Sequence, residues 1–240
     1  MLPLPASRIF LLLLPIACGF ASGQTLQRRL DERRAEFLKS APADKIGIYQ
    51  DGIDAVAASG ILEKAKKKGD KAPGFTLRNA KGEDVKLSAL LAKGPVVLTW
   101  YRGGWCPYCN IALAALQEKT PEFKKHGATL VALTPELPDH SLDTTGKNKL
   151  TFEVLSDVGN KVAREYGIVF QMTDGVAKAM RAGAKTHLRN GDESDELPLA
   201  ATYVIAPDGT IAWAFLDADY RNRAEPDDVV KALGALKSKH

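Results

Sequence analysis

Cysteine and histidine are both scarce in this 240-residue chain, and the two shortages exclude several classes of protein. Three cysteines cannot build a small disulfide-rich scaffold, and four histidines without paired spacing do not form a zinc site of the common kinds. Cys106 and Cys109 stand in a C-x-x-C spacing, which is typical of a redox pair or of half a metal site. Because two further ligands are missing, the redox pair is favoured, and neither a metal nor another cofactor is expected.

Repeats, low-complexity tracts and concentrated charge are also missing. The net charge is +4, and the basic residues are spread along the chain. The densest basic run, from Lys64 to Lys68, is typical of a solvated helix end, so no nucleic-acid partner is expected. A composition of 45% hydrophobic and 26% charged residues is that of an ordinary globular protein, and it favours one domain with extensions.

The first 23 residues have the pattern of a secretory signal peptide. Arg8 gives the basic flank, residues 9–16 form an apolar core too short for a comfortable membrane span, and small residues at 21–23 offer a cleavage site. Export to the periplasm or the cell exterior is therefore predicted, and cleavage would also remove Cys18. A lipid anchor on Cys18 and an uncleaved membrane anchor are the two alternatives. Export places the remaining cysteines in an oxidising compartment, where a partner must re-reduce them.

Residues 24–65 are predicted to form an N-terminal helical arm. The apolar residues that mark one helical face are Leu26, Leu30, Phe37 and Leu38. Pro42 breaks the segment, and Gly60 interrupts a second short apolar stripe. The arm is expected to pack either on the domain that follows or on a second subunit, and the second arrangement would give a homodimer. No chemistry is assigned to it.

The remaining residues, 66–240, alternate strands with helices, which predicts a three-layer α/β domain with a hairpin at one edge. The predicted strands are 75–77, 84–87, 95–98, 128–134, 152–155, 201–205 and 210–215. The predicted helices are 89–92, a helix that follows the cysteines and stops near Pro121, 160–166 and 226–237. A polar stretch with Pro138 and Gly146 follows Pro135, and residues 171–197 are interpreted as a long polar insertion with some helical character.

The cysteine pair lies where a buried strand turns into a helix. The apolar run 95–98 leads into the turn, and the helical pattern 111–116 leads out of it. Unpaired backbone N–H groups at a helix N-terminus stabilise negative charge, and the thiolate is the reactive form of cysteine. Pro107 suits a first helical turn because its missing N–H would have had no partner there. The turn is therefore predicted to carry thiol chemistry.

Four motifs occur in one order along residues 66–237. They are Gly69-Asp70-Lys71-Ala72-Pro73-Gly74-Phe75-Thr76-Leu77, Leu155-Ser156-Asp157, Tyr166-Gly167-Ile168 and Val204-Ile205-Ala206-Pro207-Asp208-Gly209-Thr210-Ile211. With the strand before the cysteines, they resemble the alkyl hydroperoxide reductase/thiol-specific antioxidant (AhpC/TSA) family, the peroxiredoxins, and in particular the peroxiredoxin-like branch with a C-x-x-C. The resemblance implies a thioredoxin-like three-layer α/β/α fold and a thioredoxin-dependent thiol peroxidase.

The resemblance also implies which positions are catalytic. Peroxiredoxins end the first core strand with an aromatic residue, Tyr and Pro, followed by a Thr or Ser and, three residues later, the peroxidatic Cys. Here Arg102 stands at the Pro position, Cys106 at the Thr or Ser position, and Cys109 at the peroxidatic position. The place of the family's later Arg, which helps to bind peroxide, falls at Ala200. Arg102 is interpreted either as a cation that approaches the thiolate from another direction or as a member of a surface ion pair.

Three functions remain open on these residues, and the first is preferred. It is a thiol peroxidase acting on hydrogen peroxide or organic hydroperoxides, in which Cys109 attacks, Cys106 resolves the sulfenic acid as a Cys106–Cys109 disulfide, and an external dithiol such as thioredoxin recycles the pair. The second is a protein disulfide oxidoreductase, because Trp105-Cys106-Pro107-Tyr108-Cys109 resembles the thioredoxin active site, where the first cysteine attacks. That family's cis-Pro has its place at Ala200 too, and Pro198 stands two residues early. The third is a non-enzymatic binding domain with an inert disulfide.

Several residues near the cysteine pair are predicted to have supporting or structural roles. Arg102, Trp105 and Tyr108 are expected to border the substrate, and Trp100 is expected to pack the floor of the site. Asp139 and His140 are interpreted as solvated. The charged stretch 217–223 is interpreted as ion-paired or as a subunit contact rather than as catalytic.

Overall fold

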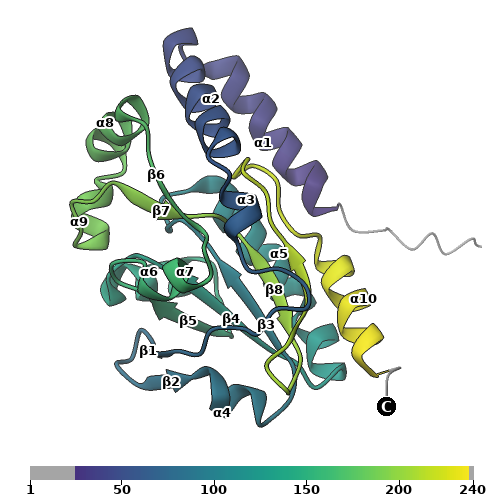
Figure 1. Cartoon of the computed structure of the whole chain (residues 1–240). Coiled ribbons are helices and arrows are strands. Elements are labelled where there is room, and N and C mark those ends of the chain that lie inside the picture. The colour runs from purple at the N-terminus through teal and green to yellow at the C-terminus, as the bar shows by residue number, and fades with distance from the viewer. Residues whose placement is uncertain (1–24, 238–240) are drawn as a thin grey trace, which may run out of the picture.

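A computed structural model describes residues 25–237, and its centre is a five-stranded sheet (Figure 1). The strand order is β5-β4-β3-β8-β9. Their bounds are β3 (Val96–Trp100), β4 (Thr129–Thr134), β5 (Glu153–Ser156), β8 (Thr202–Ile205) and β9 (Ile211–Phe215). β3 pairs parallel with β4, and β4 with β5, whereas β8 runs antiparallel to β3 and forms a hairpin with β9. The predicted edge hairpin is present.

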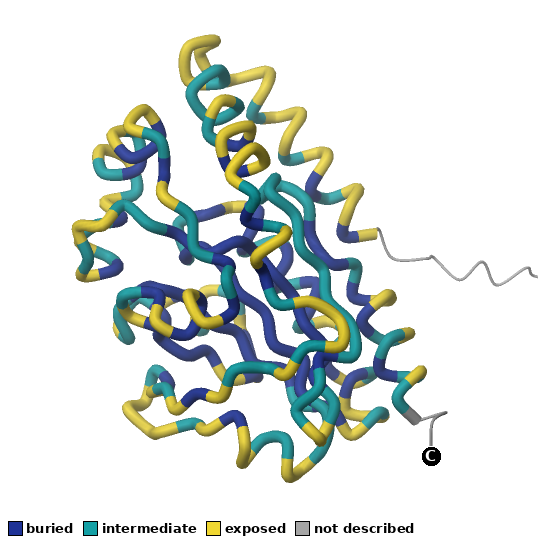
Figure 2. The backbone as a smooth tube through the Cα atoms, in the orientation of Figure 1, coloured by how far each residue is buried: buried dark blue, intermediate teal, exposed yellow. Residues whose placement is uncertain are grey.

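Helices cover both faces of this sheet, so the domain has three layers. Alternate residues of β3 explain why: Val97 joins the core with α5 (Pro107–Lys125) and α10 (Pro226–Lys237), whereas Val96 and Leu98 face the core with α4 (Leu87–Leu91) and α7 (Lys161–Glu165). A central strand buried on both faces reads as a continuous apolar run, and Figure 2 shows the sheet as buried backbone. The predicted thioredoxin-like α/β/α fold is confirmed.

Smaller elements complete the domain at its edges. β1 (Thr76–Arg78) and β2 (Asp84–Lys86) form an antiparallel pair, as do β6 (Val169–Gln171) and β7 (Glu196–Pro198). α6 (Pro138–Lys147) lies in the predicted polar stretch, for which no helix is predicted from the sequence. Ser141 and Thr144 bury one side of this helix despite its polar sequence, and their hydroxyls form hydrogen bonds to Ser156 and to the His140 carbonyl.

The N-terminal arm forms three helices, α1 (Leu26–Ser40), α2 (Ala43–Ala58) and α3 (Ile61–Lys64). Pro42 separates the first two, as predicted. Leu26 and Leu30 are buried against the α5 core of their own chain, and Phe37 packs edge-on against Tyr49 of α2 with the ring centres 5.8 Å apart, whereas Leu38 is 47% exposed. Figure 1 shows α1 and α2 as a pair projecting from one end of the sheet.

The insertion contains α8 (Asp174–Gly183) and α9 (Thr186–Asn190), and α8 lies beside α2 of the arm. Met172, Val176 and Met180 form a small separate core with Leu197, and Ile48 and Tyr49 of α2 pack against it. Arm and insertion therefore meet through apolar side chains.

The helix that carries the cysteines does not stop near Pro121, and that expectation is wrong. α5 continues to Lys125 with Pro121 inside it. Pro121 lies on the exposed side of the helix, whereas Leu116 and Phe123 on the other side are buried in the core. Burial of this face offsets the backbone hydrogen bond that a proline removes.

The predicted signal peptide lies outside the described residues. Within residues 25–237, each helix is too short or too polar to cross a bilayer.

Candidate active site

The cysteine turn joins the end of β3 to the start of α5. Cys106 is the N-cap residue of α5 and Pro107 occupies its first turn, as the sequence predicts. Both sulfurs therefore lie at the positive end of the helix dipole.

Two glycines allow this turn to pack tightly. A Cβ on Gly103 would lie 2.1 Å from Trp105 Nε1, and one on Gly104 would lie 2.0 Å from Thr144 Oγ1. Gly103 also has a positive φ of 152°. The Gly103-Gly104 pair therefore lets Trp105 fold back over the turn and lets α6 approach it closely.

Polar side chains from other elements fix the turn. The Gly104 N–H donates to Glu136 Oε2 at 2.8 Å, and the Asn110 side-chain amide donates to the Gly104 carbonyl at 2.9 Å. Glu136 is fully buried, and its Oε1 accepts a hydrogen bond from Arg189 Nε of α9 at 2.5 Å. The buried Glu136 carboxylate thus links the insertion to the cysteine turn by hydrogen bonds. The sequence analysis does not identify Glu136 as a site residue.

Cys109 lies in a buried cationic environment. It is 1% exposed, and Arg223 Nη2 donates to its Sγ at 3.4 Å. Burial raises the pKa of the Cys109 thiol, but a hydrogen bond from the Cys106 thiol, the Arg223 and Arg102 guanidinium groups and the Arg102 backbone N–H outweigh burial and hold the pKa well below its usual range. These groups therefore favour the thiolate form of Cys109.

The surroundings of Cys106 have the opposite effect on its thiol. Burial and the hydrogen bond that its thiol donates to Cys109 raise the pKa of Cys106 well above its usual range, and the Cys109 charge adds to this effect. Both cysteines are free thiols in this structure. The surroundings of the pair thus favour the thiolate at Cys109 over the thiolate at Cys106.

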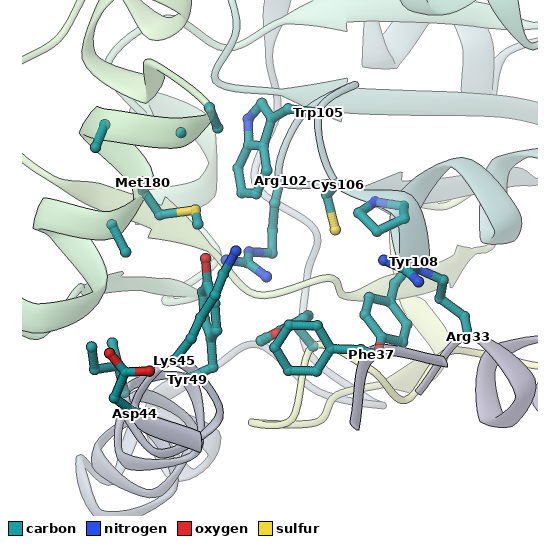
Figure 3. A pocket seen from close by; sticks show the side chains of 17 residues that line it. Arg33, Phe37, Asp44, Lys45, Tyr49, Arg102, Trp105, Cys106, Tyr108 and Met180 are labelled. Atoms are coloured by element: carbon teal, nitrogen blue, oxygen red, sulfur yellow. The ribbon is translucent and has the colours of Figure 1, made fainter. Parts of the chain in front are cut away.

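Cys106, unlike Cys109, borders an open pocket of about 790 Å³ (Figure 3). Arg102, Trp105 and Tyr108 line the same pocket, so the structure brings together the three predicted substrate-bordering residues and one of the two cysteines. The other walls come from α1, α2 and α8 and from Tyr220. Cys109 instead lines a small interior space with Arg223.

Arg102 lies at the floor of the pocket, and its interpretation as a surface ion pair is wrong. It is 3% exposed and has no carboxylate partner among residues 25–237. Its guanidinium carbon lies 4.0 Å from the centre of the Tyr220 ring and 5.0 Å from that of Trp105. Stacking between two rings holds the cation near both sulfurs without neutralising it.

One further expectation about this region fails. Trp100 does not form the floor of the site, because its side chain joins the core on the opposite face of the sheet, with ring centres of Tyr166 and Tyr203 at 4.8 and 5.9 Å. Pro198 belongs to β7, where it pairs with Val169, and the peptide bonds of the described residues are all trans. The position before β8 that the thioredoxin pattern gives to a cis-Pro is thus filled by buried alanine at 200.

The described residues contain no cluster of three or more His, Cys, Asp or Glu side chains that could hold a metal ion. The site chemistry that the geometry offers is that of a charged thiol pair.

Comparison with known proteins agrees with this geometry. The AhpC/TSA family model matches residues 68–214. The chain belongs to the AhpC/TSA family, the peroxiredoxins. Chloroplastic peroxiredoxin Q of Populus jackii is 35% identical over 173 residues, which cover 70% of this chain and 68% of the relative. The peroxiredoxin Q of Sedum lineare is 30% identical over 174 residues, covering 71% of this chain and 79% of the relative.

Solved structures agree on the fold. Peroxidoxin BcpB from Mycobacterium tuberculosis superposes with a TM-score of 0.56 at 21% identity, covering 71% of this chain and 97% of that one. Peroxiredoxin Q from Xanthomonas campestris gives a TM-score of 0.53 at 18% identity, with 67% and 90% covered. The expected family, fold and class of thiol-dependent peroxidase are confirmed.

Arg223 supplies a guanidinium to the site from a different place in the sequence than the family pattern predicts. The family's later Arg has its place at Ala200, yet a guanidinium contacts the sulfur at the peroxidatic position from Arg223, outside the matched residues. The stretch 217–223 does contain an ion pair, between Asp219 and Arg221 at 2.7 Å, but its last residue belongs to the site. No local signal in the sequence separates Arg223 from its charged neighbours, because the contact spans 114 positions.

Proposed function

We propose that this peroxiredoxin reduces hydroperoxides with Cys109 as the attacking thiolate and Cys106 as the resolving thiol. The observation that carries the proposal is the buried contact between Cys109 Sγ and the Arg223 guanidinium at 3.4 Å. Since the thiolate is the nucleophile, the sulfur with the lowered pKa is the one able to attack at neutral pH. Arg102 and Arg223 also supply the positive charge that stabilises the departing oxygen as it becomes negative.

The reaction has two steps inside the site. The Cys109 thiolate attacks the nearer peroxide oxygen, the O–O bond breaks, and a Cys109 sulfenic acid and an alkoxide form; the alkoxide takes a proton and leaves as the alcohol, or as water when the substrate is hydrogen peroxide. Cys106 then attacks the sulfenic sulfur, a disulfide forms and water leaves. Cys106 lines the pocket and Cys109 does not, so the proposal includes a rotation of the Cys106 side chain that admits the peroxide to Cys109.

An external thiol completes the cycle. Two electrons and two protons from a dithiol reductant of the thioredoxin kind restore the pair, by exchange through a mixed disulfide on Cys106, the sulfur that borders the pocket. Export to an oxidising compartment fits the need for such a partner. Export and a homodimer both stay predictions, which fractionation of cells and sedimentation of the purified protein would check.

Stopped-flow fluorescence of the reduced protein mixed with hydrogen peroxide tests the proposed activity. Trp105 borders Cys106 and serves as the reporter, and a Trp105→Phe variant followed by thiol counting controls for the signal. We expect thiol loss at least roughly a hundredfold faster than for free cysteine at the same pH, as two nearby cations and a preformed thiolate require. Oxidation no faster than that of free cysteine, together with rapid reduction of insulin disulfides, would instead assign the site to disulfide exchange.

A further inference from the structure

The described part of the chain contains two methionines, Met172 and Met180, which are buried to a similar extent but face different spaces. Their exposed fractions are 5% and 7%, and both belong to the small core between the arm and the insertion. Met180 also lines the pocket of about 790 Å³ in front of Cys106. Met172 instead borders a space of about 20 Å³, which has room for roughly one water molecule. A molecule larger than water that enters the site can therefore meet Met180 but not Met172.

Met180 reaches the same opening as the cysteine pair. Figure 3 shows its side chain extending from α8 into the pocket, on the side of Arg102, while the Cys106 sulfur borders the pocket from the cysteine turn. Peroxides convert a thioether that they can reach into a sulfoxide. A hydroperoxide on its way to the cysteine pair thus passes a second sulfur that it can oxidise.

Arg102 can assist this oxidation. Its guanidinium lines the same pocket, and its Nε is buried without a hydrogen-bond partner among residues 25–237. A cation near the departing oxygen stabilises the negative charge that develops as an O–O bond breaks. The sulfoxide oxygen that forms is a polar group in the pocket that holds this unpaired donor.

Oxidation of Met180 would change the packing that holds Arg102 in place. Trp105, Ile48 and Tyr49 pack against the core that contains Met180, and the centre of the Trp105 ring lies 5.0 Å from the Arg102 guanidinium carbon. A polar oxygen among apolar side chains is costly unless it finds a hydrogen bond. The core therefore has to open, or the oxygen has to bind Arg102. Either response moves this cation away from its place near the two sulfurs.

We infer that Met180 is an oxidation site at which excess hydroperoxide slows the enzyme. The Met180 sulfur attacks the hydroxyl oxygen of the hydroperoxide, the O–O bond breaks and a sulfur–oxygen bond forms. The hydroxyl proton moves to the departing oxygen, which leaves as the alcohol or, from hydrogen peroxide, as water. The sulfur loses two electrons and the peroxide gains them. Oxidation of Met180 does not require the proposed peroxidase function, whereas the slowing of the enzyme rests on it, so the two are tested separately.

The first test measures oxidation of both methionines in the full-length Cys106→Ser/Cys109→Ser variant, in which neither cysteine of the pair consumes the peroxide. The protein is treated with excess tert-butyl hydroperoxide, digested with a protease that cleaves after lysine, and analysed by mass spectrometry. This digestion places Met172 in peptide 162–178 and Met180 in peptide 179–185.

We expect Met180 to be oxidised at least roughly fivefold faster than Met172, because a bulky peroxide fits the pocket and not the small space. The same treatment of protein unfolded in urea should remove the difference, because both sulfurs are then open to solvent. Equal rates in the folded protein, or faster oxidation of Met172, would overturn the inference.

The second test measures the loss of enzyme rate. The wild type is exposed to excess tert-butyl hydroperoxide, its thiols are restored with dithiothreitol and counted, and its oxidation by hydrogen peroxide is compared with that of untreated protein. At equal thiol content we expect a fall of roughly 2- to 5-fold, in line with the loss of one cation–π contact. Methionine sulfoxide reductases should restore the rate, since they reverse the sulfoxide and not over-oxidation of cysteine.

Leucine variants of the two methionines assign the loss. Met180→Leu keeps the approximate volume of the side chain and should lose no rate on exposure, relative to the same variant before exposure. Met172→Leu is the matched control and should lose rate as the wild type does. A loss of equal size in Met180→Leu would overturn the inference. Slow oxidation of the untreated wild type would instead contradict the peroxidase, and with it the slowing, while selective oxidation of Met180 in the first test would stand.

Discussion

Cys106 and Cys109 are three positions apart in the chain, yet their surroundings differ in origin and in character. Cys109 faces an interior built by the sheet, α5 and the loop before α10, and it receives a guanidinium from Arg223. Cys106 faces a pocket walled by the arm and the insertion. The difference shows how one turn separates two tasks: the interior sets the charge of the reactive sulfur, and the added helices decide which molecules reach it.

Removal of the interior cation should have the largest effect on rate. A hydrogen bond from a charged donor contributes about 1.5–3 kcal/mol, so Arg223→Met should slow oxidation by hydrogen peroxide roughly 10- to 100-fold. Arg223→Lys should recover part of the rate because it keeps the charge. Arg221→Met, next to it but paired with Asp219, is the matched control and should react at the normal rate.

The pH dependence of the rate in the same variants should distinguish loss of the Arg223 charge from a structural effect of the substitution. Because Arg223 lowers the pKa of Cys109, the thiolate persists in the wild type as pH falls below the ordinary thiol pKa of about 8.5, and the rate stays constant there. In Arg223→Met the pKa rises, so the rate should begin to fall at a higher pH. An unchanged pH profile in a well-folded variant would mean that Arg223 does not set the charge on Cys109.

Closing the space beside the turn should cost both stability and rate. In Gly104→Ala the new methyl group collides with Thr144 Oγ1, and the α6 contact has to shift. We expect a loss of about 1–3 kcal/mol in the free energy of unfolding, measured with urea. Thr144→Ala in the same chain removes the colliding atom and should restore much of the loss; failure to do so would place the strain elsewhere.

Loss of a Glu136 hydrogen bond between the insertion and the cysteine turn should have a smaller effect. Glu136→Gln replaces one of two buried carboxylate oxygens by an amide that cannot accept a hydrogen bond, so either Gly104 N–H or Arg189 loses its acceptor. The expected destabilisation is about 1–2 kcal/mol. The rate with hydrogen peroxide should fall only a few-fold, since neither sulfur contacts Glu136. A rate loss as large as that of Arg223→Met would show that the turn geometry, and not the cation, limits the reaction.

The smallest change is expected at Pro121, inside the helix that carries both sulfurs. Pro121→Ala restores a backbone N–H on the exposed side of α5, and the protein should gain roughly 1 kcal/mol in the free energy of unfolding without a change in rate. A loss of rate would indicate that the proline sets the position of the cysteine turn.

Sequence patterns predict the parts of this molecule that depend on local chemistry. The buried run of β3, the helix start at Pro107 and the last helix at Pro226–Lys237 follow from periodicity and from helix-terminal residues. The roles of Arg223 and Glu136 cannot be predicted from local patterns, because the residues that they contact lie 114 and 32 positions away in the sequence. The continuation of α5 through Pro121 and the pocket wall made by α2 and α8 also depend on packing between distant segments.

The identity of the attacking sulfur is the central claim, and trapping of the sulfenic acid tests it most directly. Reduced Cys106→Ser and Cys109→Ser variants are treated with one equivalent of hydrogen peroxide in the presence of dimedone and analysed by peptide mass spectrometry. We predict a rapid dimedone adduct on Cys109 in the Cys106→Ser variant and thiol loss no faster than that of free cysteine in Cys109→Ser. A rapid adduct on Cys106 in Cys109→Ser, with an unreactive Cys106→Ser, would contradict the account and make the sulfur that borders the pocket the nucleophile.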